Sequence, residues 1–441
     1  MCNVLCFSML ADRFQPFGTT IFTEMTLLAN KHSAVNLAQG FPDFDGPEFV
    51  KRAAIEAIGI DKPGLNQYAR MFGLPPLNAA LAANWQARTQ SAIDPDTQIC
   101  VTSGCTEAIC AAMMGLINPG DEVILFEPYY DSYRASVAMA RGICSFVTLH
   151  APGATGSLLP VDERGNPNSF WFDPNQLRVA FSSGKVKAIL LNTPHNPTGK
   201  VFTREELTLI ADLCIQHNVV AITDEVYEHL TYDPALPHIH LATLPGMAER
   251  TLTLSSLGKS FSLTGWKIGW AIGPADLIKA VRAAHQFMTF ATATPLQLGA
   301  AAAVGDYPYA RGYVHDLVRF YADNRAFLAN ALRAVGFRVH EPAGAYFIMA
   351  EWPQLRIKGA LLGDTFADDV AFCKHLTAEA GVAAIPPSVF YENKQYGKPL
   401  ARFAFCKKRE TLEEAARRLH TWAGIGWAGS PSRPSISPPR G

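Results

Sequence analysis

Short apolar runs recur through the middle of the chain, separated by longer stretches with helical periodicity. Six of these runs are apolar almost throughout and do not alternate: QICVTS, DEVILFE, VKAILLNT, VVAITDE, RTLTLSS and KIGWAIG. Continuous apolar character is typical of strands buried on both faces of a sheet. Strands that alternate with helices predict an α/β fold with a parallel sheet, in which ligands bind at the carboxyl ends of the strands.

The helical stretches and the C-terminal third of the chain predict the domain organisation. Thr203 and Glu206 have the spacing of a capping box at the start of REELTLIADLCIQHN. Beyond residue 300 come a long helical region, the strand-like AYFIMAEW and LARFAFCKK, and a helix over 368–381. We therefore predict the following division: 1–45, an N-terminal arm and part of a small domain; 46–300, a large domain; 301–423, a small α+β domain; 424–441, a disordered Ser/Pro/Gly-rich tail.

The charge and hydropathy of the chain narrow the classes of partner. The 441 residues include 38 basic and 39 acidic side chains, which gives no electrostatic reason to expect nucleic acid or an anionic membrane as partner. No apolar run approaches the ~20 residues that a membrane-spanning helix needs. The opening MCNVLCFSML lacks the basic start and cleavage site of a signal peptide, so we predict a cytoplasmic protein.

Cysteines and histidines are potential metal ligands, but their spacing in this sequence favours structural roles for both groups. The nine cysteines form no CxxC pair, and we expect Cys100, Cys105 and Cys110 to be reduced and packed as small apolar groups. His229 and the pair His238 and His240 lie near one another, but no carboxylate or cysteine stands at ligand spacing from them. We interpret them as loop histidines and expect no metal.

Lys259 is the first candidate for chemistry. It follows a predicted buried strand in SSLGKSFSLTGWKIG, where GKS suggests a phosphate-binding P-loop. That motif needs a glycine at the position of Thr253, so a plain nucleotide-binding protein is excluded. A neutral lysine amine in a dry pocket at the end of a sheet condenses with aldehydes. For an isolated GK, a surface lysine in a turn remains the alternative.

Polar residues follow two further predicted strands. Asp224 ends VVAITD, where a cationic partner such as a protonated pyridine nitrogen would keep it ionised, with Tyr227 within reach of the same ligand. Capping of a following helix is an equally weighted alternative for Asp224. Asn192 and Asn196 lie in LNTPHNPTGK, where an amide donor would face a ligand, although the segment is also ordinary turn chemistry.

Three more segments supply complementary groups. SGCTEAI places residues 104–106 between a strand and a helix, and free N–H groups at a helix start bind phosphate. EPYYDSY supplies Tyr129 and Tyr130 for stacking on a flat ring. Arg402 interrupts the apolar LARFAF, and its planar guanidinium matches a carboxylate.

Taken in order, these segments resemble the fold-type-I pyridoxal-phosphate aminotransferases of the class I/II group. The similarity extends from Phe22 to Trp422 and includes NLAQGFPDF, LNQYARMFGLPPL, NTPHNPTGKVF, ITDEVYEHLTYD and GKSFSLTGWKIGW. It is strongest to the kynurenine–oxoglutarate transaminase branch, which includes cysteine-S-conjugate β-lyases, and to the methionine aminotransferases. The resemblance implies a mostly parallel seven-stranded sheet between helices, a small α+β domain and pyridoxal 5′-phosphate as cofactor.

The resemblance also implies roles for individual residues at the cofactor ring. Lys259 matches the catalytic lysine that forms a Schiff base with the cofactor and moves the substrate's α-proton. Asp224 matches the partner of the pyridine nitrogen. Tyr227 and Asn196 match the residues that bond the ring's phenolic oxygen, and Tyr130 matches the ring that stacks on the cofactor.

Further matches concern the phosphate and the substrate. The phosphate-binding group corresponds to Gly104, Cys105, Thr106, Ser256 and Lys267, with Tyr68 reaching in from a second subunit. The substrate's carboxylate is expected at Arg402, the Gly40 backbone and Asn196. Phe22 and, from the neighbouring subunit, Phe290 match pocket walls. The resemblance therefore implies a homodimer with shared active sites that takes an amino acid and a 2-oxo acid as substrates.

A few positions bear on the substrate. Lys267 replaces an arginine of many class I enzymes, as in the kynurenine branch, whereas Phe22, Ala291 and His195 lean toward the methionine aminotransferases. We predict transfer of the amino group of a hydrophobic, aromatic or sulfur-containing L-amino acid, of kynurenine or methionine type, to a 2-oxo acid. A β-lyase that uses the same site is the alternative. A non-enzymatic pyridoxal-phosphate-binding regulator is less favoured, because residues 1–21 are too short for a helix-turn-helix.

Overall fold

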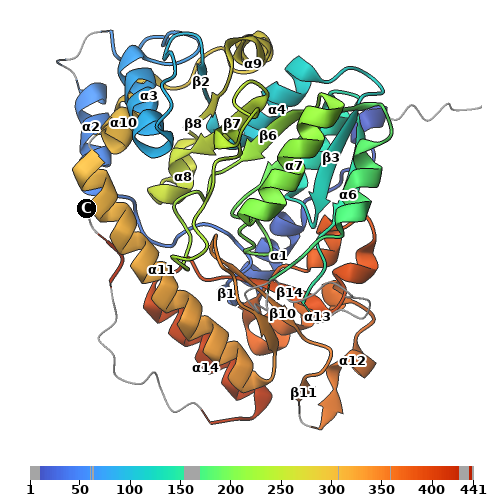
Figure 1. The fold of residues 1–441 in the computed structure, drawn as a ribbon. Coiled ribbons are helices and arrows are strands. Elements are labelled where there is room, and N and C mark those ends of the chain that lie inside the picture. The colour runs from blue at the N-terminus through green and yellow to red at the C-terminus, as the bar shows by residue number, and fades with distance from the viewer. Residues whose placement is uncertain are drawn as a thin grey trace, which may run out of the picture.

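A seven-stranded sheet forms the centre of the molecule (Figure 1). The computed structural model describes residues 10–59, 61, 64–152, 169–305, 307–357, 359–426 and 437–439. Its central strands lie in the order β2 (Ile99–Thr102), β8 (Gly269–Ile272), β7 (Thr251–Ser256), β6 (Val220–Asp224), β5 (Val186–Asn192), β3 (Glu122–Glu127) and β4 (Ile143–Thr148). Only β8 runs antiparallel to its neighbours in this sheet. The predicted, mostly parallel α/β sheet is confirmed.

The six apolar runs correspond to six of the seven strands, and β4 is the strand that the pattern missed. It lies at the edge of the sheet and pairs only with β3. Its residues from Ile143 to Phe146 are exposed or half-buried. Because one side of an edge strand faces solvent, the sequence ICSFVT lacks the continuous apolar signal of the inner strands.

Both faces of the inner strands are buried. Along β3, Val123 and Leu125 belong to one apolar cluster, whereas the alternate residues Ile124 and Phe126 belong to another. The first cluster includes α4 (Gly104–Leu116) and α9 (Ala275–Met288), and the second includes α6 (Pro174–Phe181) and α7 (Arg204–His217). The predicted capping box is confirmed at the start of α7.

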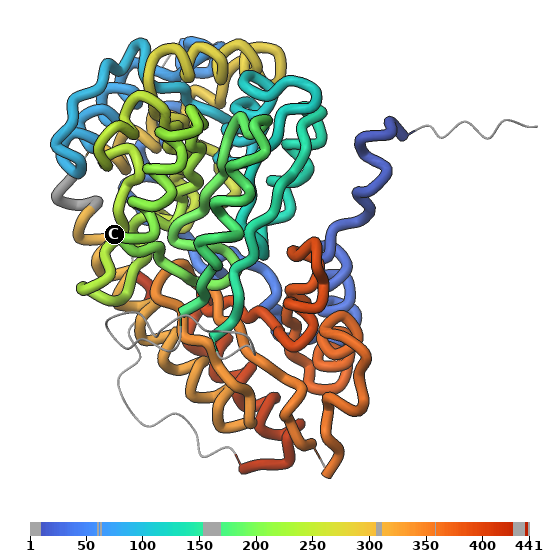
Figure 2. Tube along the Cα trace, turned by 45° about the vertical axis from the view of Figure 1, so that its right-hand side comes forward, coloured from blue at the N-terminus to red at the C-terminus, as the bar shows by residue number. Residues whose placement is uncertain are grey.

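A second, antiparallel sheet lies at the other end of the molecule. It contains β9 (Arg338–His340), β10 (Phe347–Glu351) and β14 (Leu400–Ala404), and the long α11 (Tyr307–Val335) packs along α14 (Arg409–Ala423). Figure 2 shows this C-terminal part together with α1 (Ile21–Lys31). The parallel pairing of β1 (Val35–Asn36) with β13 (Val382–Ala383) connects the N-terminal part of the chain to its C-terminal part.

The remaining elements complete the layers around the sheets. Apart from short 3-10 helices, they are α2 (Glu48–Ile58), α3 (Pro75–Thr89), α5 (Asp131–Met139), α8 (Leu257–Ser260), α10 (Thr294–Gly305), α12 (Leu362–Thr365), α13 (Asp369–His375) with its π-helical extension Leu376–Ala380, β11 (Arg356–Ile357) and β12 (Ala360–Leu361). The domain boundaries stay a prediction, and most of the predicted tail lies outside the described residues.

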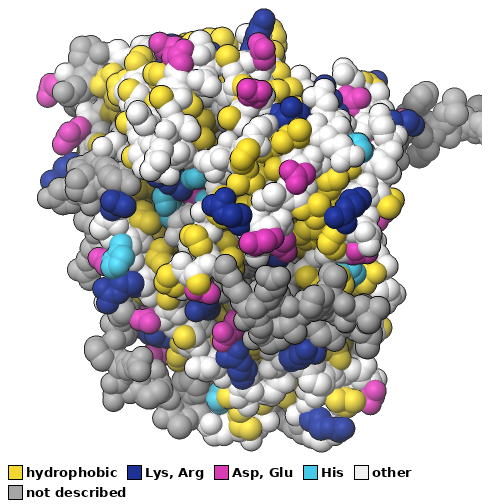
Figure 3. All heavy atoms as spheres, viewed as in Figure 1, with side chains coloured by type: hydrophobic (Ala, Val, Ile, Leu, Met, Phe, Trp, Pro, Cys, Tyr) yellow, Lys and Arg dark blue, Asp and Glu magenta, His cyan; other side chains and the backbone are white. Residues whose placement is uncertain are grey.

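The described surface carries mixed charge. On the face shown in Figure 3, acidic and basic side chains are interspersed over both ends of the molecule. Among the described residues, we find no helix with the length and apolar character needed to span a bilayer.

Candidate active site

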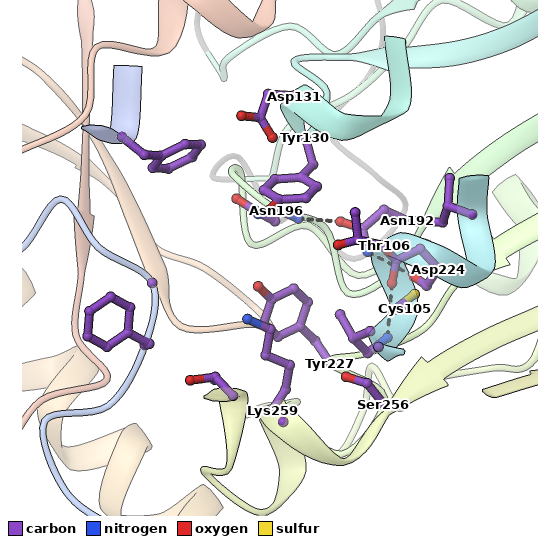
Figure 4. A pocket seen from close by; sticks show the side chains of 18 of the residues that line it. Cys105, Thr106, Tyr130, Asp131, Asn192, Asn196, Asp224, Tyr227, Ser256 and Lys259 are labelled. Carbon is purple, nitrogen blue, oxygen red and sulfur yellow. Dashed lines mark hydrogen bonds between the residues drawn. The ribbon is translucent and has the colours of Figure 1, made fainter. Parts of the chain in front are cut away.

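A cavity of about 450 Å³ opens at the carboxyl ends of the central strands. All the predicted site residues line it except Tyr68 and Phe290: Phe22, Gly40, Gly104, Cys105, Thr106, Tyr130, Asn196, Asp224, Tyr227, Ser256, Lys259, Lys267 and Arg402. Figure 4 shows side chains from separate strands and loops converging on the same space. The fold therefore brings together residues that are far apart in the sequence.

Asp224 lies at the floor of the cavity, at the end of β6. Its Oδ2 accepts a 2.6 Å hydrogen bond from the phenol of Tyr133, and its Oδ1 accepts from the N–H of Val226. Burial raises the pKa of Asp224, while these hydrogen bonds and the charge of Lys259 act in the opposite direction. Residues 226–229 form a turn, so the alternative that Asp224 caps a helix is wrong.

Asn196 and Arg402 are joined in one hydrogen-bond chain. Asn192 Oδ1 accepts from the backbone N–H of Asn196, which fixes the loop after β5. Arg402 Nη1 donates to Asn196 Oδ1 at 3.0 Å, and Arg402 Nη2 donates to the carbonyl of Ala38 at 2.8 Å. Because the Asn196 oxygen is engaged, its Nδ2 group is the donor left for a ligand.

Arg402 is buried among aromatic rings. Its guanidinium carbon lies 4.2 Å from the ring centre of Phe347 and 5.2 Å from that of Phe22. Only 1% of the residue is exposed, and burial lowers the pKa of Arg402 to about 10. Its Nε has no hydrogen-bond partner among the described residues. A buried cation with an unsatisfied N–H provides a site for a carboxylate.

Lys259 approaches the cavity from the short helix α8, directly after β7. Its Nζ lies 5.8 Å from the ring centres of both Tyr227 and Tyr346. Burial lowers the pKa of Lys259, and the positive charge of Lys267 acts in the same direction. The neutral amine that nucleophilic chemistry needs is thereby favoured. The alternative of a surface lysine in a turn is wrong.

The start of α4 has the features of an anion site. Gly104 has a φ of +78°, and a Cβ built there would lie 3.3 Å from Nζ of Lys267. The first N–H groups of a helix have no partner within the helix, and the helix dipole favours an anion there. Gly104, Cys105 and Thr106 supply such groups, beside Ser256 and Lys267.

The Gly40 backbone is held in a fixed orientation. Tyr346 donates a 2.6 Å hydrogen bond to its carbonyl, and a Cβ at Gly40 would lie 2.6 Å from the ring of Phe347. Only glycine fits this close approach. The donor set of the cavity thus comprises an amine, a buried carboxylate, a helix N-terminus beside Lys267 and a buried guanidinium, which fits a phosphorylated pyridine aldehyde and a carboxylate substrate.

Tyr68 and Phe290 lie outside the cavity of their own chain. Tyr68 is 87% exposed and Phe290 is 48% exposed, and their rings contact each other edge-on at 5.5 Å. The prediction that they serve a neighbouring subunit's site stays a prediction.

Several lining residues were missed in the sequence. Tyr133, Asp131, Gln39, Phe41 and Phe347 all line the cavity. Tyr133 stands one helical turn after Tyr130 on α5, and that spacing is the signal that would have found it. The position of Phe347 depends on how the second sheet packs against the first, which no local pattern encodes.

The histidine interpretation needs a correction. Glu225 lies beside His238 and His240, so a carboxylate partner is present that ligand spacing in the sequence did not reveal. The three side chains meet because the loop carrying both histidines folds back onto the end of β6. The cysteine prediction is confirmed, since Cys100, Cys105 and Cys110 are free and buried.

Comparison with known proteins agrees with this geometry. The family model described as aminotransferase class I and II matches residues 32–419. A probable N-succinyldiaminopimelate aminotransferase of Mycobacterium tuberculosis is 43% identical, covering 94% of this chain and 99% of that protein. Kynurenine–oxoglutarate transaminase 3 of Mus musculus is 41% identical, covering 93% of this chain and 90% of that protein.

A solved structure of an aminotransferase is also similar to this chain. The Escherichia coli protein YbdL, for which a methionine aminotransferase function has been identified, superposes with a TM-score of 0.83 at 35% identity and covers 94% of this chain and 100% of its own. The chain belongs to the class I and II aminotransferases and is a pyridoxal-phosphate-dependent transaminase.

Proposed function

We propose that the enzyme transfers the amino group of a hydrophobic, aromatic or thioether L-amino acid to a 2-oxo acid. This proposal rests on the aromatic rings that surround Arg402. Phe22 lies 6.3 Å from Tyr130 and 5.7 Å from Phe390, ring centre to ring centre. A substrate carboxylate on Arg402 would leave the substrate side chain against these rings, where apolar burial stabilises binding.

The charges in the cavity support the same substrate class. Arg402 is the only arginine among the described residues that line it. Asp131 adds a carboxyl group near Tyr130, and burial raises the pKa of that carboxyl. A substrate with a second carboxylate would lack an arginine partner in this chain and would approach an acidic side chain. This disfavours aspartate and N-succinyldiaminopimelate as preferred donors.

The residues divide the chemistry between them. Pyridoxal phosphate, when bound, supplies an electron-withdrawing ring that stabilises negative charge at the substrate's α-carbon. Lys259 would move the proton from the substrate's α-carbon to the cofactor carbon that carries the nitrogen, and would move it in the opposite direction in the second half-reaction. Asp224 provides the negative charge that favours a protonated ring nitrogen. Arg402 and the Nδ2 group of Asn196 orient the substrate and the cofactor.

We also propose that the active enzyme is a homodimer in which each subunit contributes to the other's site. Large apolar side chains are exposed at the end of α9 and directly after it, Phe287 at 86% and Phe290 at 48%. Tyr68 is exposed beside Phe290. Exposed aromatic side chains that contact one another are typical of interaction surfaces.

The test is a substrate matrix with purified holoenzyme. Methionine, phenylalanine, kynurenine, glutamine, aspartate and N-succinyldiaminopimelate would each be assayed against several 2-oxo acids. We expect the highest kcat/KM for methionine, phenylalanine or kynurenine. A highest value for N-succinyldiaminopimelate or aspartate would overturn the proposed substrate class but not the transaminase chemistry. Pyruvate release from a cysteine S-conjugate without any acceptor would identify the β-lyase alternative.

A further inference from the structure

A second cavity, of about 860 Å³, lies on the side of β7 and β8 that faces α3 and α11. Four histidines line it, His229, His238, His240 and His315, together with Trp85 and other side chains. None of these histidines takes part in the transaminase chemistry described above. Ser256 lines both cavities.

A carboxylate and two of these imidazoles meet behind the wall of this cavity. Glu225 Oε2 lies 2.8 Å from Nε2 of His238 and is also hydrogen-bonded to Nδ1 of His240. The three potential ligand atoms all lie within 4.8 Å of one another. The Glu225 side chain is fully buried, and the side chains of His238 and His240 are 4% and 8% exposed.

The hydrogen bonds within the cluster leave buried polar atoms unsatisfied. Neither Oε1 of Glu225 nor Nδ1 of His238 has a hydrogen-bond partner among the described residues. Unsatisfied buried polar atoms cost about 1–3 kcal/mol each, so a group with two of them is expected to have a further function. An additional ligand on the free carboxylate oxygen would remove part of that cost.

The chemistry of the donors indicates which ligand. Two imidazole nitrogens and one carboxylate oxygen form a ligand set for Zn²⁺, Co²⁺ or Ni²⁺, whereas Mg²⁺ and Ca²⁺ prefer oxygen donors. In a tetrahedral site with metal–ligand bonds of about 2.0–2.1 Å, ligand atoms lie roughly 3.3 Å apart. The cluster therefore needs side-chain shifts of about an ångström to hold the ion, with the remaining coordination position open to the cavity.

We propose that Glu225, His238 and His240 bind one divalent transition-metal ion of the Zn²⁺ class, with water in the position facing the second cavity. The ion would fasten the loop of His238 and His240 to the end of β6, immediately after Asp224. A metal bound by three protein ligands from two segments stabilises the folded state by the free energy of its binding.

Metal stoichiometry of the holoenzyme tests this proposal directly. Protein freed of adventitious metal by chelation and dialysis would be equilibrated with buffered Zn²⁺, and bound Zn²⁺ would be measured against protein. We expect one tightly bound ion per chain in the wild type. His238→Gln and His240→Gln should each lose that ion at the same free Zn²⁺ concentration. The control His340→Gln should retain it, because His340 pairs with a single carboxylate, Glu351, outside the cluster.

Co²⁺ provides a second readout that identifies the ligands. Its visible absorption reports coordination number and donor type, and the wild type should show the bands of a four- or five-coordinate nitrogen and oxygen site. Zn²⁺ should also raise the unfolding temperature of the wild type and of His340→Gln, but not of the two cluster variants. A wild type that binds no stoichiometric Zn²⁺ or Co²⁺, or a His238→Gln variant that binds like the wild type, would overturn the proposal.

Discussion

The phenol of Tyr133 donates a 2.6 Å hydrogen bond to Oδ2 of Asp224, and both side chains are buried. The two residues come from α5 and β6, and only the fold brings them together. Burial disfavours the ionised carboxylate, whereas a hydrogen bond to the charged form favours it. Tyr133 therefore helps to keep Asp224 ionised, as the proposed pairing with a protonated pyridine nitrogen requires.

Replacing Tyr133 with phenylalanine should raise the pKa of Asp224 further. A hydrogen bond to a charged group contributes about 1.5–3 kcal/mol, so the acid limb of the kcat/KM profile should move upward by roughly one pH unit or more. Affinity for pyridoxal phosphate should fall in parallel. The control is Tyr129→Phe, because Tyr129 stacks on Phe146 instead. An unchanged acid limb in Tyr133→Phe would contradict the role given to this hydrogen bond.

Substitution of Lys259 by alanine should abolish turnover with little change in fold. Removal of both the nucleophile and the proton carrier is expected to lower kcat by about 10⁴-fold or more. The absorption band of covalently bound cofactor should disappear. The control Lys394→Ala, at an exposed lysine, should keep both this band and normal turnover. If Lys259→Ala retained the band and full turnover, the assignment of the catalytic lysine would be wrong.

The lowered pKa of Lys259 has its own consequence for pH dependence. Only the neutral amine attacks an aldehyde, and burial shifts the pKa below its ordinary value of 10.5. The rate at which apoenzyme attaches pyridoxal phosphate should rise with pH and level off below that value. Rapid-mixing absorbance measurements across the pH range would follow this. A rate that continued to rise beyond pH 10.5 would show that the amine is not perturbed.

Arg402 should not be replaceable by lysine. Its two Nη groups hold Asn196 Oδ1 and the Ala38 carbonyl, and lysine cannot reproduce that planar arrangement. Loss of one partner in a buried charged pair costs about 2–5 kcal/mol, so kcat/KM for the amino acid should fall by roughly 30-fold or more. Steady-state kinetics with phenylalanine or methionine would measure this, with circular dichroism to confirm folding. A normal KM in Arg402→Lys would exclude Arg402 as the carboxylate site.

The sequence predicted the sheet and most of the cavity because short local patterns of residues determine both. Strands buried on two faces give continuous apolar runs, and the polar residue that ends each run lies at the ligand edge, as Asp224 and Asn192 do. The contacts that the sequence did not predict depend on packing between distant segments. Glu225 meets His238 and His240 only after the loop between them folds back, and Phe347 reaches the cavity only because the second sheet packs against the first.

The proposed sharing of active sites between two subunits predicts complementation between two inactive variants. In a mixed dimer of Lys259→Ala and Tyr68→Ala chains, one of the two sites has both Lys259 and the partner subunit's Tyr68. Random exchange makes half of the dimers mixed, so about a quarter of wild-type activity should return after denaturation and joint refolding. Refolding each variant alone is the control. If no activity returned, although analytical ultracentrifugation showed dimers, Tyr68 would not serve the neighbouring site.

Asp131 should set the preference against substrates with a second carboxylate. Its carboxyl group lines the cavity beside Tyr130, so a distal carboxylate would meet like charge when both are ionised. Asp131→Asn keeps the shape and removes the charge. Relief of about 1 kcal/mol of repulsion should raise kcat/KM for glutamate roughly three- to ten-fold and leave that for phenylalanine nearly unchanged. Asp212→Asn, on the exposed side of α7, is the matched control. Equal changes for glutamate and phenylalanine would mean that Asp131 supports the loop of Tyr130 and does not select the substrate.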